Sequence, residues 1–298
     1  MNILLTGHKG QLGRLLRPAL SDLGRLTTVD RNAMDLSVLA SIVSILEQIK
    51  PDLIVNAAAY TNVDKAEKNP LEAAAVNGAA PGLMARWAAE NASSMIHFST
   101  DYVFDGSGDQ PWCEDAKPNP INVYGESKNI GDKEVLASGA PNLIFRTSWV
   151  YAARGQNFMT TMLRLGKERS ELRVVMDQIG APTPAALIAN ATAEIIKQGK
   201  ENLLALLRDK GGVVNLTPKG ETSWHGFAEA IFHSAKAHGL QLRVSRVEPI
   251  HSREYALPAP RPLNSRLALN RLRERFDISP PSWQEALTTV MKDFTGSA

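Results

Sequence analysis

The sequence has little cysteine and no large excess of either charge. Only one of its 298 residues, Cys113, is a cysteine, so the chain forms no internal disulfide and supplies no cluster of thiolate metal ligands. Lysine and arginine number 33 against 31 aspartates and glutamates, a formal net charge of +2. Binders of nucleic acid polymers or of anionic membranes carry a clear basic excess, so this balance argues against both classes.

Long apolar runs are missing as well. The longest stretch without a charged residue, 178–193, covers 16 residues and contains two prolines, which makes it too short and too broken to span a membrane. Met1 and Asn2 lead directly into the apolar run 3–5, with no basic leader and no cleavage site. Together with the single cysteine, these features predict a soluble cytoplasmic protein.

What the sequence does contain is an alternation of two patterns through its first half. Short apolar runs predict strands over 3–6, 26–29, 53–55, 95–98 and 143–145. Apolar residues at helical spacing predict helices over 11–22, 37–48, 70–90 and 124–136. Ser37 suits the N-cap of the second helix, and Pro70 suits the first turn of the third. Because parallel strands need crossover connections, this order predicts a doubly wound α/β fold around a parallel sheet.

The alternation weakens after residue 150. Helical spacing recurs over 156–169, 185–197, 222–238 and 283–294. We therefore predict a dinucleotide-binding domain over 1–150 and a smaller α/β domain over 151–298 that mainly binds substrate, with some segments returning to the first sheet. The Gly-, Pro- and Asp-rich segment 105–122 reads as a long loop, which in a compact domain is usually functional or mobile.

A glycine-rich turn, Gly7-His8-Lys9-Gly10-Gln11-Leu12-Gly13, joins the first predicted strand to the first helix. Glycines at this junction permit a tight turn, let backbone N–H groups approach a pyrophosphate, and bring the helix N-terminus toward the phosphates. An ordinary strand–helix turn is the alternative. The position directly after the first strand favours a Rossmann-type dinucleotide site.

The end of the second predicted strand carries a carboxylate, Asp30, that would accept hydrogen bonds from an adenosine ribose and so favour NADH. Lys9 and Arg31 are close in sequence and would suit the 2′-phosphate of NADPH, so the choice of cofactor stays open. Asp35 and Leu36 would lie near an adenine, although Asp35 equally suits a position flanking a helix.

Tyr124 and Lys128 stand four residues apart on a predicted helix and therefore share one face. A nearby ammonium stabilises a phenolate and lowers the pKa of the tyrosine toward the range useful for acid–base catalysis. A chance pair on a solvated helix is the alternative. Ser99 and Thr100 end the fourth predicted strand, at the sheet edge where ligands bind, and either hydroxyl would suit a substrate carbonyl.

Together these residues resemble the extended short-chain dehydrogenase/reductases, and more narrowly the family of dTDP-4-dehydrorhamnose reductases. The narrower resemblance rests on long ordered strings that cover the chain from residue 1 to about residue 290. They are the segments 56–67, 99–106, 122–125, 145–151, 177–183 and 261–267.

The resemblance implies reduction of the C4 keto group of dTDP-6-deoxy-L-lyxo-4-hexulose by NADPH or NADH, giving dTDP-L-rhamnose for cell-surface polysaccharides. By position, Tyr124 would donate the proton, Thr100 would hydrogen-bond the carbonyl, and Lys128 would lower the Tyr124 pKa. The cofactor would contact Tyr124, Lys128 and the segment Ala57, Ala58, Ala59 and Tyr60. The substrate would contact Asp101, Tyr102, Trp149, Asn157, Arg261 and Arg266.

Two positions depart from the family pattern. Some members dimerise around Mg²⁺ through glutamates, but the matching positions here are Leu15 and the stretch at Ala185 and Ala186. The chain is therefore expected to bind no metal and to be a monomer or a homodimer without a metal bridge. Tyr60 replaces a common histidine, which removes support for a family contact there but leaves the catalytic set intact.

Two other functions remain open on this fold. A nucleotide-sugar epimerase would keep Tyr124 and Lys128, and a regulatory subunit that binds cofactor would usually lose them. Residues without an assigned role are interpreted as structural. The core is expected to contain Trp224, Phe227, Ile231 and Phe232, and Cys113 is expected to have no chemical role. The six histidines lack the spacing of zinc ligands, so no zinc site is expected. Eight arginines, no lysine and three glutamates lie in 243–275, a basic section that suits a dianionic sugar nucleotide.

Overall fold

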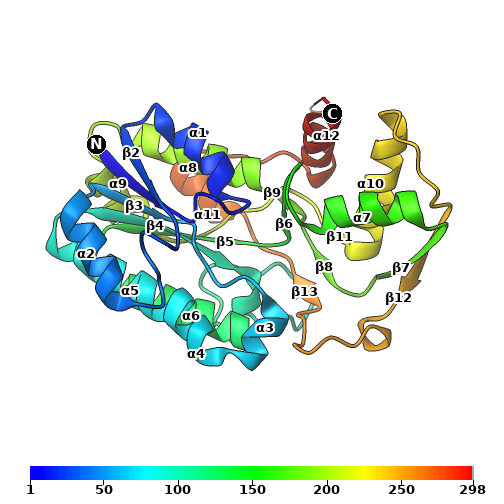
Figure 1. Cartoon of the computed structure of the whole chain (residues 1–298), viewed down its shortest axis with the longest axis horizontal. Helices are drawn as coiled ribbons and strands as arrows, with labels where there is room; N and C mark the ends of the chain where they lie inside the picture. Colours follow the sequence, from blue (N-terminus) through cyan, green and yellow to red (C-terminus); the bar gives the residue numbers. More distant parts are fainter. Residues whose placement is uncertain (297–298) are drawn as a thin grey trace.

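A six-stranded parallel sheet organises the larger part of the molecule (Figure 1). The structure is a computed structural model that describes residues 1–296. The strands are β1 (Asn2–Thr6), β2 (Arg25–Val29), β3 (Leu53–Asn56), β4 (Ser94–Thr100), β5 (Asn142–Thr147) and β10 (Gly212–Asn215), in the spatial order β10-β5-β4-β3-β1-β2. The chain leaves β1 toward one side for β2 and returns to the other side for β3, which makes a topological switch point beside β1.

Helices cover both faces of this sheet, which explains why its strands are continuously apolar rather than alternating. On one face, Ile3, Leu5 and Phe145 pack with α1 (Gly13–Ser21), α8 (Ala185–Gln198), α9 (Leu203–Lys210) and α11 (Asn270–Phe276). On the other, Leu4 and Ile144 pack with α2 (Leu39–Ile49), α5 (Ala80–Glu90) and α6 (Val123–Ala137). This arrangement confirms the predicted doubly wound α/β fold.

A second apolar core lies beside the sheet, on the right of Figure 1. It joins α7 (Phe158–Glu168), α10 (Trp224–Ala237) and α12 (Trp283–Thr295) to the parallel pair β7 (Glu171–Val175) and β12 (Arg246–Ile250). Short strands connect this part to the sheet: β6 (Val150–Tyr151), β8 (Ile179–Gly180), β9 (Thr183–Pro184), β11 (Thr222–Ser223) and β13 (Asn264–Ser265). The chain crosses back and forth, because β10, α8, α9 and α11 belong to the first core although they follow residue 150.

Several local predictions need correction. Ser37 does not cap the second helix, which begins at Leu39 after Val38; its hydroxyl donates to Asp35 instead. The single helix predicted over 70–90 has three parts: α4 (Pro70–Ala74), a π-helical turn η1 (Ala75–Ala79) and α5, preceded by a short α3 (Val63–Lys68). The predicted loop 105–122 is held by a β-bridge between Trp112 and Leu267. Two single 3₁₀ turns, η2 (Asp101–Val103) and η3 (Ser252–Glu254), lie outside this loop.

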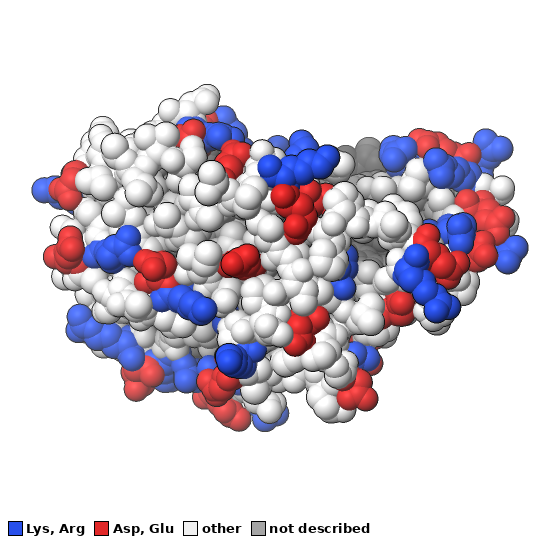
Figure 2. All heavy atoms as spheres, turned by 90° about the horizontal axis from the view of Figure 1, so that it is seen from below, with Lys and Arg blue, Asp and Glu red and all other residues white. Residues whose placement is uncertain are grey.

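The surface agrees with the balanced composition. On the face drawn in Figure 2, lysine and arginine are interspersed with aspartate and glutamate, and neither sign forms a continuous patch. Among the described residues, no helix has the length and the apolar character needed to cross a membrane.

Candidate active site

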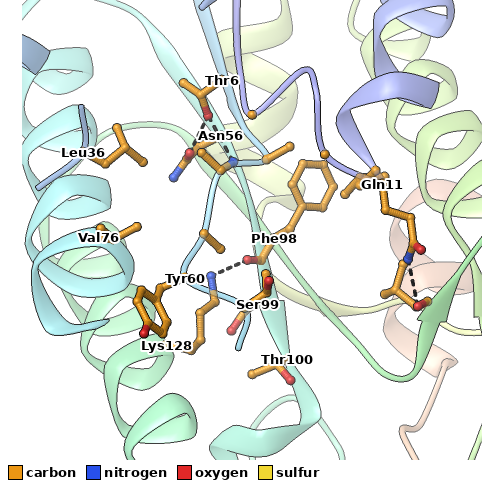
Figure 3. Close-up of a pocket in the computed structure, with 18 of the residues that line it drawn as sticks. Thr6, Gln11, Leu36, Asn56, Tyr60, Val76, Phe98, Ser99, Thr100 and Lys128 are labelled. Carbon is orange, nitrogen blue, oxygen red and sulfur yellow. Dashed lines mark hydrogen bonds between the residues drawn. The ribbon is translucent and has the colours of Figure 1, made fainter. Parts of the chain in front are cut away.

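The carboxyl ends of four neighbouring strands open into a cavity of about 760 Å³. Thr6, Asn56, Thr100 and Thr147 are the last residues of β1, β3, β4 and β5, and all four line it. Because the strands are parallel, their carboxyl ends share one edge of the sheet, where ligands of open α/β sheets bind. Figure 3 shows the side chains that converge there.

The glycine-rich turn forms the cavity wall next to β1. Gly7 has φ +66°, and a Cβ there would lie 2.7 Å from the backbone of Ala57 and Ala58. A Cβ on Gly13, the first residue of α1, would lie 2.1 Å from the Gly7 carbonyl oxygen. Only glycine therefore fits at either place, and the backbone stays open toward the cavity. Gly7, Gly10, Gln11 and Leu12 line the cavity as predicted, whereas Lys9 and Gly13 lie outside its lining.

Charged side chains gather at the far end of this cavity. The Lys9 ammonium lies 2.5 Å from the Asp30 carboxylate, and this hydrogen bond holds the pKa of Asp30 below its usual value. The Arg31 guanidinium lies 3.3 Å from Asp35 and 3.4 Å from Glu72. Asp30, Arg31, Asp35 and Leu36 all line the cavity, as does Glu72, which the sequence reasoning did not single out.

The segment after β3 forms the adjoining wall. Ala57, Ala58, Ala59 and Tyr60 line the cavity in the predicted place. Asn77, on the π-helical turn, holds this segment: its side chain accepts from the Tyr60 N–H at 2.8 Å and donates to Ser127 on α6 at 2.9 Å. The sequence contained no signal for Asn77, since its role depends on the packing of the π turn against α6.

Tyr124, Lys128 and Thr100 meet at the cavity floor, all three among its lining residues. Tyr124 and Lys128 lie on α6, whose start is fixed by the Asn122 side chain accepting from the Gly125 N–H. The Lys128 ammonium is 1% exposed and donates to the Phe98 carbonyl oxygen of β4 at 2.6 Å, the bond drawn in Figure 3. It also lies 3.2 Å from His97 Nε2.

The expected effect of Lys128 on Tyr124 is absent in the chain by itself. Burial raises the pKa of the Tyr124 phenol above its usual value; a hydrogen bond with Thr100 lowers it, and the charges of Asp101 and Asp132 raise it further. Burial also lowers the pKa of Lys128 to about 8, against the opposing charge of Asp132. The ammonium turns toward the β4 backbone, which the i, i+4 spacing does not reveal, and its effect on Tyr124 during catalysis stays a prediction.

Aromatic side chains close the cavity on the side of the second core. Trp149 has φ +48°, a backbone conformation that is strained for a tryptophan, and its ring stacks on Trp224 with 3.7 Å between ring centroids. Trp224 was predicted to be core like Phe227, Ile231 and Phe232, which are buried as expected. For Trp224 that prediction was wrong, because its indole lines the cavity and lies on the surface of the second core.

A second cavity of about 790 Å³ adjoins the first, and Tyr102 and Trp224 line both. Its walls are mostly apolar and come from α7, β7, β12 and the segment 255–261. Arg261 lines it as predicted and pairs with Asp64 at 2.9 Å. Phe158, Gln178 and Tyr255 also line it, although nothing in the sequence had marked them.

Two predicted substrate residues lie outside both cavities. The Asn157 side chain caps α7, where it accepts from the Thr160 N–H and donates to the Ala152 carbonyl. The neighbouring Gln156 lines the first cavity instead. Arg266 is held by Glu221 at 2.6 Å. Both residues are polar, as a substrate contact requires, but their side chains are held by partners within the protein.

The first cavity fits a dinucleotide. In addition to the glycine turn, four buried atoms of lining residues have no hydrogen-bond partner within residues 1–296: Gln11 Oε1, Ser99 Oγ, Asp101 Oδ2 and Thr147 Oγ1. Buried polar atoms are normally satisfied, so these are available to a ligand. The described residues contain no group of three or more His, Cys, Asp or Glu side chains that would hold a metal.

A doubly wound sheet with a glycine turn after its first strand, and with Tyr124 and Lys128 at its carboxyl edge, defines a dinucleotide-dependent enzyme of the short-chain dehydrogenase/reductase type. The family model described as the RmlD substrate binding domain matches residues 1–295. The chain belongs to this family.

Known relatives match along the whole chain. A dTDP-4-dehydrorhamnose reductase of Burkholderia thailandensis is 44% identical over 295 residues, which cover 98% of this chain and 99% of the relative. The reductase of Escherichia coli strain K12 is 42% identical over the full length of both chains. The crystal structure of a dTDP-4-dehydrorhamnose reductase from Bacillus anthracis in complex with NADP superposes with a TM-score of 0.88 at 33% identity, covering 98% of this chain and 99% of that one.

Proposed function

We propose that this protein reduces the C4 keto group of dTDP-4-dehydrorhamnose with NADPH or NADH, giving dTDP-L-rhamnose. One observation carries the proposal: the glycine-walled cavity and the mostly apolar second cavity meet at Tyr102 and Trp224, and the Tyr102 ring lies 5.6 Å from the ring of Tyr124. Full-length similarity to reductases of this substrate supports it. Hydride transfer requires a cofactor and a sugar side by side, which two adjoining cavities provide.

The cofactor would lie in the first cavity. Its pyrophosphate suits the open backbone of the glycine turn at the N-terminus of α1, where the helix dipole favours negative charge. Its adenosine end suits Asp30, Arg31, Asp35 and Leu36, and the segment 57–60 forms the adjoining wall. When bound, the cofactor supplies the hydride.

The sugar nucleotide would lie in the second cavity, with its sugar between the Trp149–Trp224 stack and Tyr102. Arg261 is the basic side chain placed for the diphosphate. The proposed division of the chain follows: residues 1–150, with the later segments that return to the sheet, bind the cofactor, and the remainder mainly binds substrate.

Three side chains act on the carbonyl. Tyr124 donates a proton to the C4 oxygen as negative charge develops there, and the Thr100 hydroxyl hydrogen-bonds the same oxygen. Lys128 lines the cavity on the same helix as Tyr124, and its charge would favour the phenolate that forms when Tyr124 gives up its proton. Thr100 and Lys128 are buried and Tyr124 is half-buried, which limits contact with water and strengthens these interactions.

The decisive experiment follows NAD(P)H absorbance with dTDP-4-keto-6-deoxyglucose, with and without its 3,5-epimerase. Oxidation that depends on the epimerase supports the proposed substrate. Oxidation without the epimerase would indicate another 4-keto sugar, and interconversion of sugar epimers without net oxidation would indicate an epimerase. We also propose that the protein is cytoplasmic, and that it is a monomer or a homodimer without a metal bridge. A chelator should therefore leave its size in solution unchanged.

A further inference from the structure

Gln178 stands out in the second cavity because other side chains engage both ends of its amide. Its Oε1 accepts a hydrogen bond from the Trp224 indole N–H at 3.1 Å. Its Nε2 donates to the Ser252 hydroxyl oxygen at 2.9 Å. Gln178 is 9% exposed and lines only the second cavity, whereas Trp224 lines both. A nearly buried amide therefore holds the ring that lies where the two cavities adjoin.

The strand pairing places Gln178 beside Trp224. β8 and β11 pair antiparallel with Ile179 opposite Ser223, so the next position of this register brings Gln178 opposite Trp224. An indole N–H can only donate, and the amide oxygen must therefore face it while the amide nitrogen turns away. The pairing thus fixes one orientation of the Gln178 amide.

A carboxylate and a serine fix the other end of the amide. Ser252 lies on the turn η3, and its hydroxyl donates to Asp177 Oδ1 at 2.6 Å. The Ser252 N–H donates to the same carboxylate, at 2.9 and 3.1 Å from its two oxygens. Because the only hydroxyl hydrogen of Ser252 goes to Asp177, its oxygen is left to accept from Gln178. Asp177, Ser252, Gln178 and Trp224 form one chain in which each donor has an acceptor.

This chain ends at the stack of two indoles. The rings of Trp224 and Trp149 lie 3.7 Å apart between centroids with 13° between their planes. Gly180, two residues after Gln178, makes room for the stack, since a Cβ there would lie 3.0 Å from the Trp149 ring. A stacked ring can slide and turn within its own plane at little cost, whereas a hydrogen bond at Nε1 also fixes its edge. Gln178 therefore determines which edge of Trp224 faces the cavities.

Assuming the proposed reduction of a sugar nucleotide, we propose that Gln178 is a positioning residue of the sugar site that acts through Trp224. Asp177 and Ser252 hold Gln178 in the orientation that this needs. With its edge fixed, the Trp224 ring gives the sugar one apolar wall and keeps one boundary toward the cofactor. A ring without this hydrogen bond occupies part of the space for the sugar, which weakens binding of the sugar nucleotide more than binding of the cofactor.

The first test compares two glutamines by steady-state kinetics. Gln178→Met keeps the length of the side chain and removes both hydrogen bonds. KM for the sugar nucleotide should rise about fivefold, as expected for one lost hydrogen bond, and KM for NADPH by less than about twofold. Gln198→Met is the matched control, because the Gln198 amide donates to the Phe276 carbonyl oxygen at 2.9 Å and lines neither cavity. An unchanged KM for the sugar nucleotide in Gln178→Met would overturn the inference.

A double-mutant cycle separates action through Trp224 from direct contact with the sugar nucleotide. Trp224→Phe keeps an aromatic ring but has no N–H for Gln178 to hold. In that background, Gln178→Met should therefore raise KM no further. Additive effects of the two substitutions would mean that Gln178 contacts the substrate itself, which contradicts the positioning role.

A readout without substrate separates this inference from the proposed function. The chain has five tryptophans, and each indole N–H gives one signal in a nitrogen–proton NMR spectrum. The signal that is missing in Trp224→Phe should move upfield in Gln178→Met, while those of Trp87 and Trp112, whose N–H groups have other acceptors, should stay in place. An unmoved Trp224 signal would overturn the inference even in an active enzyme. A moved signal in a protein whose wild type oxidises no NAD(P)H would instead overturn the proposed function.

The far part of the chain is tested at Ser252. Ser252→Ala keeps Gln178 but removes the acceptor of its amide nitrogen. The Trp224 signal should therefore move in the same direction as in Gln178→Met, but less far. This variant also tests the inference if Gln178→Met does not fold, and an unmoved Trp224 signal in it would contradict the proposed chain.

Discussion

The two adjoining cavities are built in different ways. The wall of the first comes largely from short segments, each placed by the sheet strand that it follows, such as the turn 7–12 after β1 and the segment 57–60 after β3. The second is assembled from α7, β7, β12 and the segment 255–261, which meet only in the folded protein. Local backbone geometry therefore governs the first cavity, whereas side-chain packing over long distances governs the second. Substitutions should separate the two.

The largest expected effect falls at Tyr124, whose ring lies 5.6 Å from the ring of Tyr102 at the junction of the cavities. Tyr124→Phe removes the proton donor but keeps the ring, so kcat should fall about 1,000-fold. Fluorescence titration with NADPH should give an unchanged dissociation constant. Turnover close to that of the wild type would remove Tyr124 from the mechanism.

A change in the first cavity should affect the cofactor alone. Gly7→Ala places a methyl group 2.7 Å from the Ala57 and Ala58 backbone at φ +66°, so NADPH should bind about 100-fold more weakly. Gly108→Ala is the matched control, since φ there is +69° but no atom lies within 4 Å of the added methyl group. Calorimetry should show weak NADPH binding in the first variant only, and equal affinities would contradict the close approach.

A change where the two cavities meet should affect the sugar nucleotide more than the cofactor, since Trp224 lines both cavities. Trp224→Ala removes the ring that stacks on Trp149, so KM for the sugar nucleotide should rise about tenfold and KM for NADPH by less. Trp224→Phe retains an aromatic surface and should recover part of the loss. An equal rise in both KM values would mean that the two cavities do not act independently.

The far end of the first cavity should set cofactor choice. Asp30→Ala removes a carboxylate that would repel a 2′-phosphate and frees Lys9, so the ratio of kcat/KM for NADPH over NADH should rise about tenfold. Lys9→Ala should shift the ratio in the opposite direction. The prediction fails if neither ratio changes.

The smallest effect concerns stability. The pKa of Asp101 is raised in the folded protein, so the unfolded chain ionises first and the wild type loses stability as pH rises from about 4 to 7. Asn carries no charge, so Asp101→Asn should have a Tm about 2–4 °C higher than the wild type at pH 8. At pH 4 the difference should disappear. A constant difference at both values would show that ionisation is not its source.

Sequence reasoning predicted the elements of the first region well, because strand patterns and glycine turns are local. It placed all five N-terminal strands but missed β10 and the helices α9 and α11, whose segments join the sheet from far along the chain. It chose Asn157 and Arg266 by residue type, yet both are held by neighbouring side chains and backbone. It assigned Trp224 to the core because helical spacing alone does not reveal which partner a ring meets.

The sequence by itself determined the doubly wound fold, the glycine turn, and the set formed by Tyr124 and Lys128 on one helix face, since each depends on residue type and short spacing. Only the tertiary structure decided the charges and partners within that set. The buried Lys128 ammonium donates to the β4 backbone, and the buried Asp101 carboxyl has no cationic partner within residues 1–296. Desolvation and hydrogen bonding depend on atoms brought together from distant segments, so no local pattern encodes them.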